Sequence, residues 1–342
     1  MRLKLPGSEQ LLFAANILAG NLFFGSKPAA SVVSILVVKW DEIGDMAACT
    51  HVFELLKTEY PGATLHVLCK PFVAGMITSD PYVDGILTDV SEWNKPYDLV
   101  AELRGTWKTL FRSLRFRPKM RCSRALVRWQ NKGQQLHETE TNFEAIRPLL
   151  KAGAQFIAPR LYFSDSDQQV VDAFLTSRNI NRIALIHAGA RRKLRQWNPE
   201  RFALAATYLH KQYGMDIVFI GSEDEQADIK RIMNDLAFVS HDASGLFTLS
   251  QLACLCSRAN FYLGNESGPL QIACAFQLPL IALFGPGVPE VFYPRHKRAV
   301  VLHHILPCNP CDQIHCVQPS DPCISRIQTA DVLIRIDEIL QP

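Results

Sequence analysis

Residues Asn260–Pro286 read NFYLGNESGPLQIACAFQLPLIALFGP, and this stretch decides the fold that we expect for the chain. A short apolar run ends at Gly264, a turn follows, and Pro269 suits the first position of a helix. A second apolar run, residues 280–284, comes after that helix, so the stretch predicts strand, turn, helix and strand. The first N–H groups of a helix have no partner within the helix and attract anions. At the carboxyl end of a parallel strand, this turn is therefore expected to hold the phosphates of a nucleotide.

Strands and helices alternate on both sides of this stretch. Segments with helical spacing or helix-start signals separate the apolar runs, and such alternation predicts parallel βαβ units. The runs of strand length lie at residues 32–38, 64–68, 85–87, 97–103, 183–187, 216–220, 261–263 and 280–284. We expect an α/β fold with two halves in series, whose parallel sheets face a cleft between the domains.

The expected domain boundaries follow from the alternation. A first α/β domain is expected over residues 31–178. A second α/β domain, which contains the turn expected to hold a nucleotide, is expected over residues 179–327, and a C-terminal helix over residues 328–342. Residues 1–30 form an extension in which residues 11–25 are apolar but lack the features of a signal peptide, so we expect an amphipathic helix there.

The overall composition excludes several classes of protein. The 342 residues, 48% of them hydrophobic and 20% charged, are typical of a globular chain that is long enough for two cores. No run of about twenty apolar residues occurs, so we expect no membrane span. The net charge of +3 does not favour a nucleic-acid partner. Neither G-x-G-x-x-G nor G-x-x-x-x-G-K-[ST] is present, so no motif supports a redox dinucleotide or a P-loop.

Two local biases in composition point to partners. The segment Arg104–Lys132 is rich in Lys and Arg and has no Asp or Glu. It is either a surface for an anionic acceptor or a membrane, or a solvated helical hairpin. A cysteine cluster near the C-terminus has the spacing C-x2-C-x4-C-x6-C, which suits a closed structural zinc or iron site, free thiols and disulfides being the alternatives. Its members are Cys308, Cys311, Cys316 and Cys323.

Four stretches in this order resemble glycosyltransferase family 9, the heptosyltransferase-like enzymes. They are ILVVKWDEIGDMAACTHVFELLKTEYPGATLHVL, IALIHAGARRKLRQWNPERF, VFIGSEDE and SGLFTLSQLACLCSRANFYLGNESGPLQIACAFQLPLIALFGP. The resemblance covers residues 32–327 and implies the GT-B architecture, which consists of two Rossmann-like domains with the active site between them. It also implies an inverting, metal-independent transfer of a sugar, most often heptose from ADP-heptose, to a lipopolysaccharide core.

The resemblance assigns the catalytic residue to the loop after the first strand. Asp45 matches the family's proposed general base, which takes the proton of the attacking acceptor hydroxyl. Gly44 leaves room for a sugar next to the backbone. The residues alone also allow Asp45 to cap the following helix, and Asp41 or Glu42 to serve as the base.

The resemblance places the donor site in the second half. Arg195 matches the family's phosphate-binding lysine, although its three basic neighbours at 191–193 are alternatives. Glu223 matches the acid that binds the ribose hydroxyls, and otherwise reads as an acid near a helix start. The remaining residues expected to bind the nucleotide sugar are His187, Gly189, Asn265, Glu266, Ser267, Gly268 and Gln271.

Two residues depart from the family pattern. Glu266 stands where the family usually has Asp, and Gln271 where it usually has His, so the identity of the sugar is open. Arg104 is expected to bind an anionic acceptor. The implied enzyme is cytoplasmic, at the inner face of the inner membrane, and acts on a lipid-linked or polysaccharide acceptor. The alternatives are a protein heptosyltransferase of the autotransporter type and a non-catalytic sugar-nucleotide-binding module.

Overall fold

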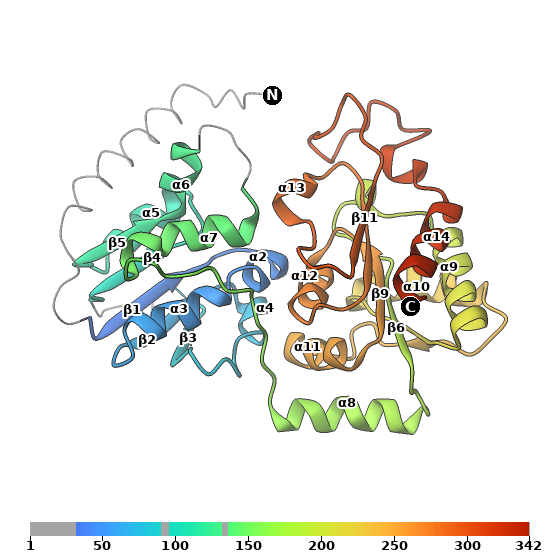
Figure 1. Ribbon diagram of the computed structural model, residues 1–342, viewed down its shortest axis with the longest axis horizontal. Coiled ribbons are helices and arrows are strands. Elements are labelled where there is room, and N and C mark those ends of the chain that lie inside the picture. The colour runs from blue at the N-terminus through green and yellow to red at the C-terminus, as the bar shows by residue number, and fades with distance from the viewer. Residues whose placement is uncertain (1–31, 90–95, 132–135, 342) are drawn as a thin grey trace. The chain divides into compact units, whose positions relative to one another are not determined.

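The structure is a computed structural model that describes residues 32–89, 96–131 and 136–341 (Figure 1). The chain forms two compact units, Met1–Arg160 and Leu161–Pro342. The amphipathic helix expected in residues 1–30 lies outside the described residues.

Unit 1 is built on a five-stranded sheet in the order β3-β2-β1-β4-β5, in which all neighbouring strands are parallel. The strands are β1 (Ser34–Val38), β2 (Thr64–Leu68), β3 (Gly85–Leu87), β4 (Leu99–Glu102) and β5 (Met120–Ser123). The helices are α2 (Ile43–Ala47), α3 (His51–Glu59), α4 (Pro71–Ala74), α5 (Trp107–Leu114), α6 (Arg124–Gln130) and α7 (Glu138–Ile146). The basic segment is not a helical hairpin, because β5 lies between α5 and α6 as the edge strand of this sheet.

Unit 2 is built on a six-stranded parallel sheet in the order β11-β10-β9-β6-β7-β8. The strands are β6 (Ile183–His187), β7 (Asp216–Phe219), β8 (His241–Asp242), β9 (Phe261–Asn265), β10 (Leu280–Phe284) and β11 (Ala299–His303). The helices are α8 (Asp165–Ser177), α9 (Pro199–Tyr213), α10 (Gln226–Asn234), α11 (Leu249–Arg258), α12 (Gly268–Ala275), α13 (Pro289–Phe292) and α14 (Thr329–Leu340). The predicted strand, turn, helix and strand of residues 260–286 are confirmed as β9, α12 and β10.

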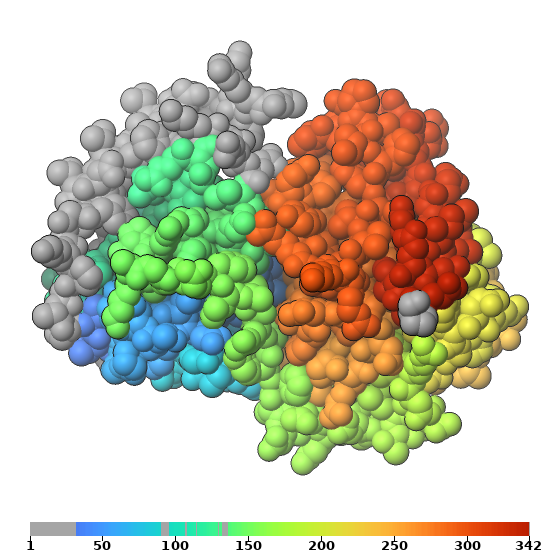
Figure 2. All heavy atoms as spheres, in the orientation of Figure 1, coloured from blue at the N-terminus to red at the C-terminus, as the bar shows by residue number. Residues whose placement is uncertain are grey.

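The two units meet in the chain after Arg160, whereas the sequence placed the boundary after residue 178. The difference concerns α8, which packs against α11 of unit 2 and whose Asp167 accepts a hydrogen bond from Ser250 Oγ at 2.7 Å. Figure 2 shows the light green atoms of α8 on the surface beside the orange atoms of α11. The helix α8, which the sequence analysis assigned to the first domain, therefore belongs to unit 2.

The core of unit 2 lies between the sheet and the helices α9 and α14, which are in contact. Phe261, Leu263, Ile281 and Leu283 are fully buried on β9 and β10. Asp337 of α14 accepts hydrogen bonds from the hydroxyls of two tyrosines of α9, at 2.8 and 2.5 Å, and so fixes the C-terminal helix. In the part of the chain that the structure describes, no helix combines the length and the apolar character needed to cross a membrane.

Candidate active site

Asp45 lies in the first turn of the short helix α2, directly after the loop that leaves β1. The N-cap position of this helix belongs to Glu42, so Asp45 is not the capping residue that one reading of the sequence allowed. Burial raises the pKa of the Asp45 carboxyl to about 6, and the nearby Lys39 opposes the shift. A carboxylate with a pKa close to neutral is suited to accept a proton from a hydroxyl group.

A network of buried charges surrounds the carboxyl end of β1. Lys39 Nζ lies 2.9 Å from Glu138 Oε1 and 3.3 Å from Asp41 Oδ2, and these three side chains are fully buried. Arg124 also pairs with Glu138. Burial alone raises the pKa of Glu138, but Lys39 and Arg124 outweigh burial and lower it to about 2. Each buried charge of this network therefore has an opposite charge beside it.

The three carboxylates that could serve as the base, Asp41, Glu42 and Asp45, differ in their ion-pair partners. Asp41 is held in ion pairs with Lys39 and Arg104, and Glu42 pairs with Lys70 at 2.6 Å. Both groups therefore have structural partners, which favours Asp45 as the proton acceptor. Gly44, expected to admit a sugar, lies beside Asp45 in α2.

Arg104 follows β4, and its loop is held by the buried carboxylate of Glu102. This carboxylate accepts hydrogen bonds from the backbone N–H groups of Arg104 and Gly105, at 3.1 and 2.8 Å. The side chain of Arg104 is 40% exposed while it pairs with Asp41. An arginine has five N–H donors, so this ion pair leaves donors for an anionic acceptor.

In unit 2, the side chain of Asn265 at the end of β9 holds both ends of the loop that runs from β6 to α9. Its Oδ1 accepts from the N–H of Trp197 at 3.0 Å. Its Nδ2 donates to the carbonyls of Ala188 and Gly189, at 2.7 and 3.2 Å. Asn265 is fully buried, and its amide makes hydrogen bonds only to backbone groups of the protein in this structure. We expected Asn265 to bind the nucleotide sugar, but in this structure it holds the loop that carries Arg195.

Ser267 is the N-cap residue of α12, and its side chain makes no capping hydrogen bond. Instead its Oγ lies 2.9 Å from Nδ1 of His187, at the end of β6. Gly268 begins the helix, which places the N–H groups of the first turn at this strand end. Gln271 is buried in α12 and donates to the carbonyl of Phe292 at 2.7 Å, so it attaches α12 to α13.

Arg195 and Glu266 form an ion pair, with Arg195 Nη1 3.3 Å from Glu266 Oε1. Arg195 Nε also donates to the side chain of Gln313 at 2.7 Å. Burial raises the pKa of Glu266 to about 7, and Arg195 opposes the shift. A Cβ atom at Gly287 would stand 1.9 Å from Glu266 Oε2, so the longer acid of this chain is accommodated by a glycine. The structure thus brings together Arg195, predicted to bind a phosphate, and Glu266, predicted to bind the sugar.

Of the acidic residues that follow β7, the one that reaches the strand ends is not the one that the sequence indicated. Glu223, expected to bind ribose, is exposed and packs against Gly245. Glu225 reaches the strand ends, and its Oε2 lies 3.3 Å from His187 Nε2. A Cβ at Gly189 would stand 1.8 Å from Glu225 Oε1, so this glycine makes room for Glu225. The sequence signal for Glu225 was the capping box that it forms with Ser222.

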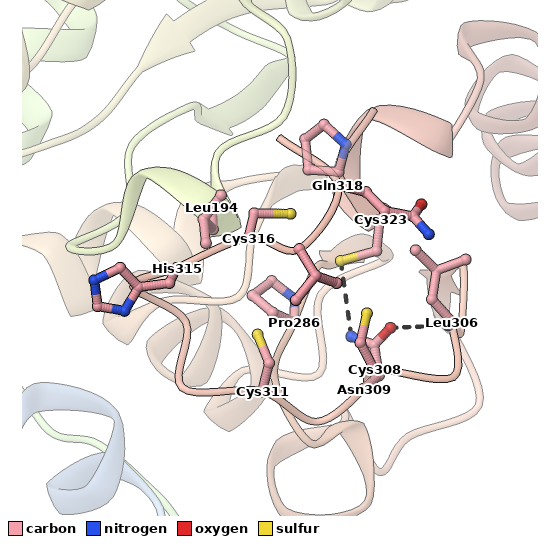
Figure 3. Close-up of a pocket in the computed structure, with 12 residues that line it drawn as sticks. Leu194, Pro286, Leu306, Cys308, Asn309, Cys311, His315, Cys316, Gln318 and Cys323 are labelled. Carbon is pink, nitrogen blue, oxygen red and sulfur yellow. Dashed lines mark hydrogen bonds between the residues drawn. The ribbon is translucent and has the colours of Figure 1, made fainter. Parts of the chain in front are cut away.

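The four clustered cysteines line one pocket of about 30 Å³ together with Leu194 and Pro286 (Figure 3). The four thiols point toward this pocket, whereas the imidazole of His315 points away. Yet no three His, Cys, Asp or Glu side chains among the described residues are placed to hold a metal ion. The structural zinc or iron site predicted at Cys308, Cys311, Cys316 and Cys323 is therefore not supported.

The cysteine segment instead contacts the donor loops. Gln313 of this segment binds Arg195, and the pocket is lined by Leu194, the residue before Arg195. Two of the thiols accept hydrogen bonds within the segment: Cys311 Sγ from the N–H of Gln313 at 3.3 Å, and Cys323 Sγ from Asn309 Nδ2 at 3.7 Å. The segment thus helps to position the guanidinium group of Arg195.

Comparison with known proteins shows the family and the fold of the chain. Residues 94–320 match the family model described as glycosyltransferase family 9 (heptosyltransferase). The chain is 24% identical over 286 residues to lipopolysaccharide heptosyltransferase 3 of Escherichia coli, which covers 71% of this chain and 80% of the relative. The glycosyl transferase family 9 structure from Veillonella parvula matches with a TM-score of 0.81 and 18% identity, over 92% of this chain and 99% of that chain. ADP-heptose lps heptosyltransferase II of E. coli matches with a TM-score of 0.73 and 19% identity, over 90% and 98%. The fold is accordingly GT-B, with two Rossmann-like units.

The buried network predicts a large loss of stability when Lys39 is replaced. Lys39→Met leaves Asp41 and Glu138 with less opposing charge in a buried position, so we expect unfolding to require about 3–5 kcal/mol less free energy. Lys119→Met is the control, because Lys119 pairs with Asp98 at 2.7 Å but is 68% exposed, and such a pair contributes about 1 kcal/mol or less. Equal effects of the two substitutions in urea denaturation would contradict the assignment.

We also expect replacement of Asn265 to destabilise the protein more than replacement of Asn260. Asn265→Ala leaves one backbone N–H and two carbonyls without their partner, and we expect a loss of about 2–4 kcal/mol together with weaker nucleotide binding. Asn260→Ala removes one hydrogen bond, to the N–H of Ile183, at the other end of the same strand. That control should cost about 1 kcal/mol and leave nucleotide binding unchanged. Denaturant unfolding and calorimetric titration with ADP measure both effects.

Proposed function

Because this chain belongs to glycosyltransferase family 9, we propose that it transfers a heptose from ADP-heptose to a lipopolysaccharide core or another polysaccharide acceptor. The observation that carries the proposal is the meeting of Arg195, Glu266 and the N-terminus of α12 at the strand ends of unit 2. This arrangement offers positive charge and N–H donors for a diphosphate beside a carboxylate for a sugar. The E. coli structure that matches with a TM-score of 0.73 is that of an ADP-heptose lps heptosyltransferase, which supports this choice of donor.

On the donor side, the site has to stabilise the leaving nucleoside diphosphate. Arg195 keeps N–H donors beyond those that bind Glu266 and Gln313, and these suit the phosphate oxygens. The N–H groups at Gly268 add donors that are fixed in place before the reaction. Glu266 accepts from a sugar hydroxyl, and the exposed Glu223 accepts from the ribose hydroxyls. No step needs a metal ion in this scheme.

On the acceptor side, Asp45 acts as the general base. It takes the proton of the acceptor hydroxyl while that oxygen forms a bond to the anomeric carbon of the sugar. The bond from the anomeric carbon to the β-phosphate oxygen breaks on the opposite face, and the electron pair leaves with ADP. One displacement of this kind inverts the configuration at the anomeric carbon.

The acceptor is expected to be anionic, since Arg104 and the exposed bases of α5 lie in unit 1. A phosphorylated, lipid-linked core at the cytoplasmic face of the inner membrane suits these charges. The alternative of a protein acceptor rested on the four-cysteine metal site. Since the described residues do not form that site, the polysaccharide acceptor is retained.

Replacing the base tests the proposed reaction. Asp45→Asn keeps the shape of the side chain but accepts no proton, so transfer to the acceptor should fall by about 10²–10⁴-fold while ADP-heptose still binds. Asp80→Asn is the matched control, because burial also raises the pKa of Asp80 to about 6 but this residue is outside the candidate site. Transfer measured by mass spectrometry should be unaffected in the control. A native rate in Asp45→Asn would show that another residue is the base.

The raised pKa of Asp45 also predicts the pH dependence of transfer. The base must be ionised, so kcat/KM should be low below the pKa of about 6 and should rise as the pH increases through that value. A rate that stays constant between pH 5 and pH 7, over a range in which the enzyme remains folded, would contradict a catalytic role for Asp45.

A further inference from the structure

The guanidinium group of Arg195 is held at two of its three nitrogens by side chains of unit 2. Nε donates to Gln313 Oε1 at 2.7 Å, and Nη1 lies 3.3 Å from Glu266 Oε1. The two partners come from different parts of the chain, since Glu266 follows β9 and Gln313 lies 118 residues beyond Arg195. A guanidinium is planar, so contacts at two nitrogens fix its plane as well as its position.

The contact between Gln313 and Arg195 allows only one arrangement of donor and acceptor. An arginine side chain stays charged in proteins, and its nitrogens only donate. The amide oxygen of Gln313 must therefore face Nε, because a turned amide would place two donors against each other. Nε carries a single hydrogen, and Gln313 takes it. The hydrogens that remain for a ligand are those of the two Nη atoms.

Gln313 sits in a tight turn of the cysteine segment. Its backbone has a φ of +64°, in the left-handed region that residues other than glycine seldom adopt. Asp312 holds the turn, because its Oδ1 accepts from the N–H groups of the two residues after Gln313, at 2.8 and 2.9 Å. The N–H of Gln313 itself donates to Cys311 Sγ at 3.3 Å. A residue that its neighbours hold in an unfavourable conformation is a candidate for a functional role.

The loop on the other side of this contact is packed against the end of β10. A Cβ atom at Gly285, directly after β10, would stand 2.8 Å from the carbonyl oxygen of Leu194 and 3.5 Å from Cα of Arg195. Gly285 thus lets the backbone of Arg195 approach the strand end. The side chain of Arg195 is 26% exposed, so its two partners hold it without closing it off.

A guanidinium held in this way offers a ligand fewer choices than a free one. A free arginine can present either Nε with one Nη atom, or both Nη atoms, to a pair of phosphate oxygens. Since Gln313 occupies Nε, the second mode is the one left. Each Nη atom carries two hydrogens, so Nη1 can donate to a ligand while it pairs with Glu266. Part of the entropy cost of ordering a long side chain is also met before the ligand binds.

We propose that Gln313 is a positioning residue of the donor site, which fixes the plane of Arg195 and directs its two Nη atoms to the oxygens of a diphosphate. The inference rests on the proposed function, since it requires a nucleoside diphosphate at the strand ends of unit 2. Gln313 need not touch the ligand itself. Its contribution to binding should therefore depend both on the guanidinium of Arg195 and on the phosphates of the ligand.

A double-mutant cycle with ADP as the probe tests the dependence on Arg195. Gln313→Met keeps a side chain of similar length but removes the amide oxygen, and should weaken ADP binding by about tenfold in calorimetry. In an Arg195→Met background, the same substitution should change binding less than twofold. Gln318→Met is the control, because Gln318 lies in the same segment but accepts from a different arginine, Arg326, at 2.8 Å. It should change ADP binding less than twofold.

Adenosine as a second probe tests the dependence on the phosphates. Because this nucleoside has no phosphate, Gln313→Met should weaken its binding less than twofold in ligand-observed NMR. A substitution that only loosened the loops of the donor site would weaken the binding of adenosine and ADP alike. If the wild-type protein binds GDP or UDP instead of ADP, that nucleotide and its nucleoside take the place of ADP and adenosine in both experiments.

The outcomes separate the role of Gln313 from the function on which it rests. Equal losses of ADP affinity in both backgrounds, no loss with the native Arg195, or an equal loss for adenosine would overturn the role of Gln313 while leaving the donor site intact. If the wild-type protein binds none of ADP, GDP and UDP, the proposed function fails and this role fails with it. Thermal unfolding shows whether each variant is folded, and Gln313→Asn, which is shorter by one carbon, replaces Gln313→Met if the latter does not fold.

Discussion

The fully buried amide of Asn265 is the interaction on which the donor site depends. Both ends of the loop from β6 to α9 would otherwise have unpaired backbone groups at the carboxyl edge of the second sheet. The amide accepts from one N–H group and donates to two carbonyls, which is the full use of its two hydrogens. Because the β6 loop and Trp197 are held to β9 in this way, Arg195, Ser267 and His187 converge at these strand ends.

In unit 1, ion pairs instead of an amide hold the carboxyl end of the central strand. At the end of β1 the fully buried Lys39 takes the place that an apolar residue has along the rest of the strand, and the carboxylates of Asp41 and Glu138 surround it. Such groups lose their hydration on folding, and only close opposite charges offset that loss. The result is a fixed, polar strand end next to Asp45. Each unit thus has a buried polar centre, built on paired side chains or backbone groups, behind the residues that are proposed to act on a substrate.

Sequence patterns were sufficient for the architecture. Long apolar runs predicted the central strands, and the glycine-containing turn after Leu263 predicted the strand–helix junction that carries Ser267. The patterns failed where an element lacks its own signal. Residues 120–123, Met-Arg-Cys-Ser, form an edge strand inside a basic segment, and residues 241–242 form a strand of two residues. Pairing with neighbouring strands decides both, and no local periodicity reports it.

Side-chain partners were harder to predict than elements. The role of Asn265 depends on carbonyls 77 and 76 residues away in the chain, and Glu225 depends on glycines that leave space for it. The cysteine spacing indicated a metal site, but spacing along the chain does not determine how the thiols are placed in space. Glu138 was missed for the opposite reason: it lies in a helix of polar residues, and nothing in the sequence indicated that its charge is buried.

The central claim is that the strand ends of unit 2 bind a nucleoside diphosphate. Hydrogen–deuterium exchange of the whole chain, with and without saturating ADP, tests it most directly because it locates the ligand on the backbone. The account predicts slower exchange in residues 187–196 and in the first turn of α12, and no change at the amino ends of the same strands. Protection confined to other parts of the chain, with these segments unchanged in the presence of bound ADP, would contradict it.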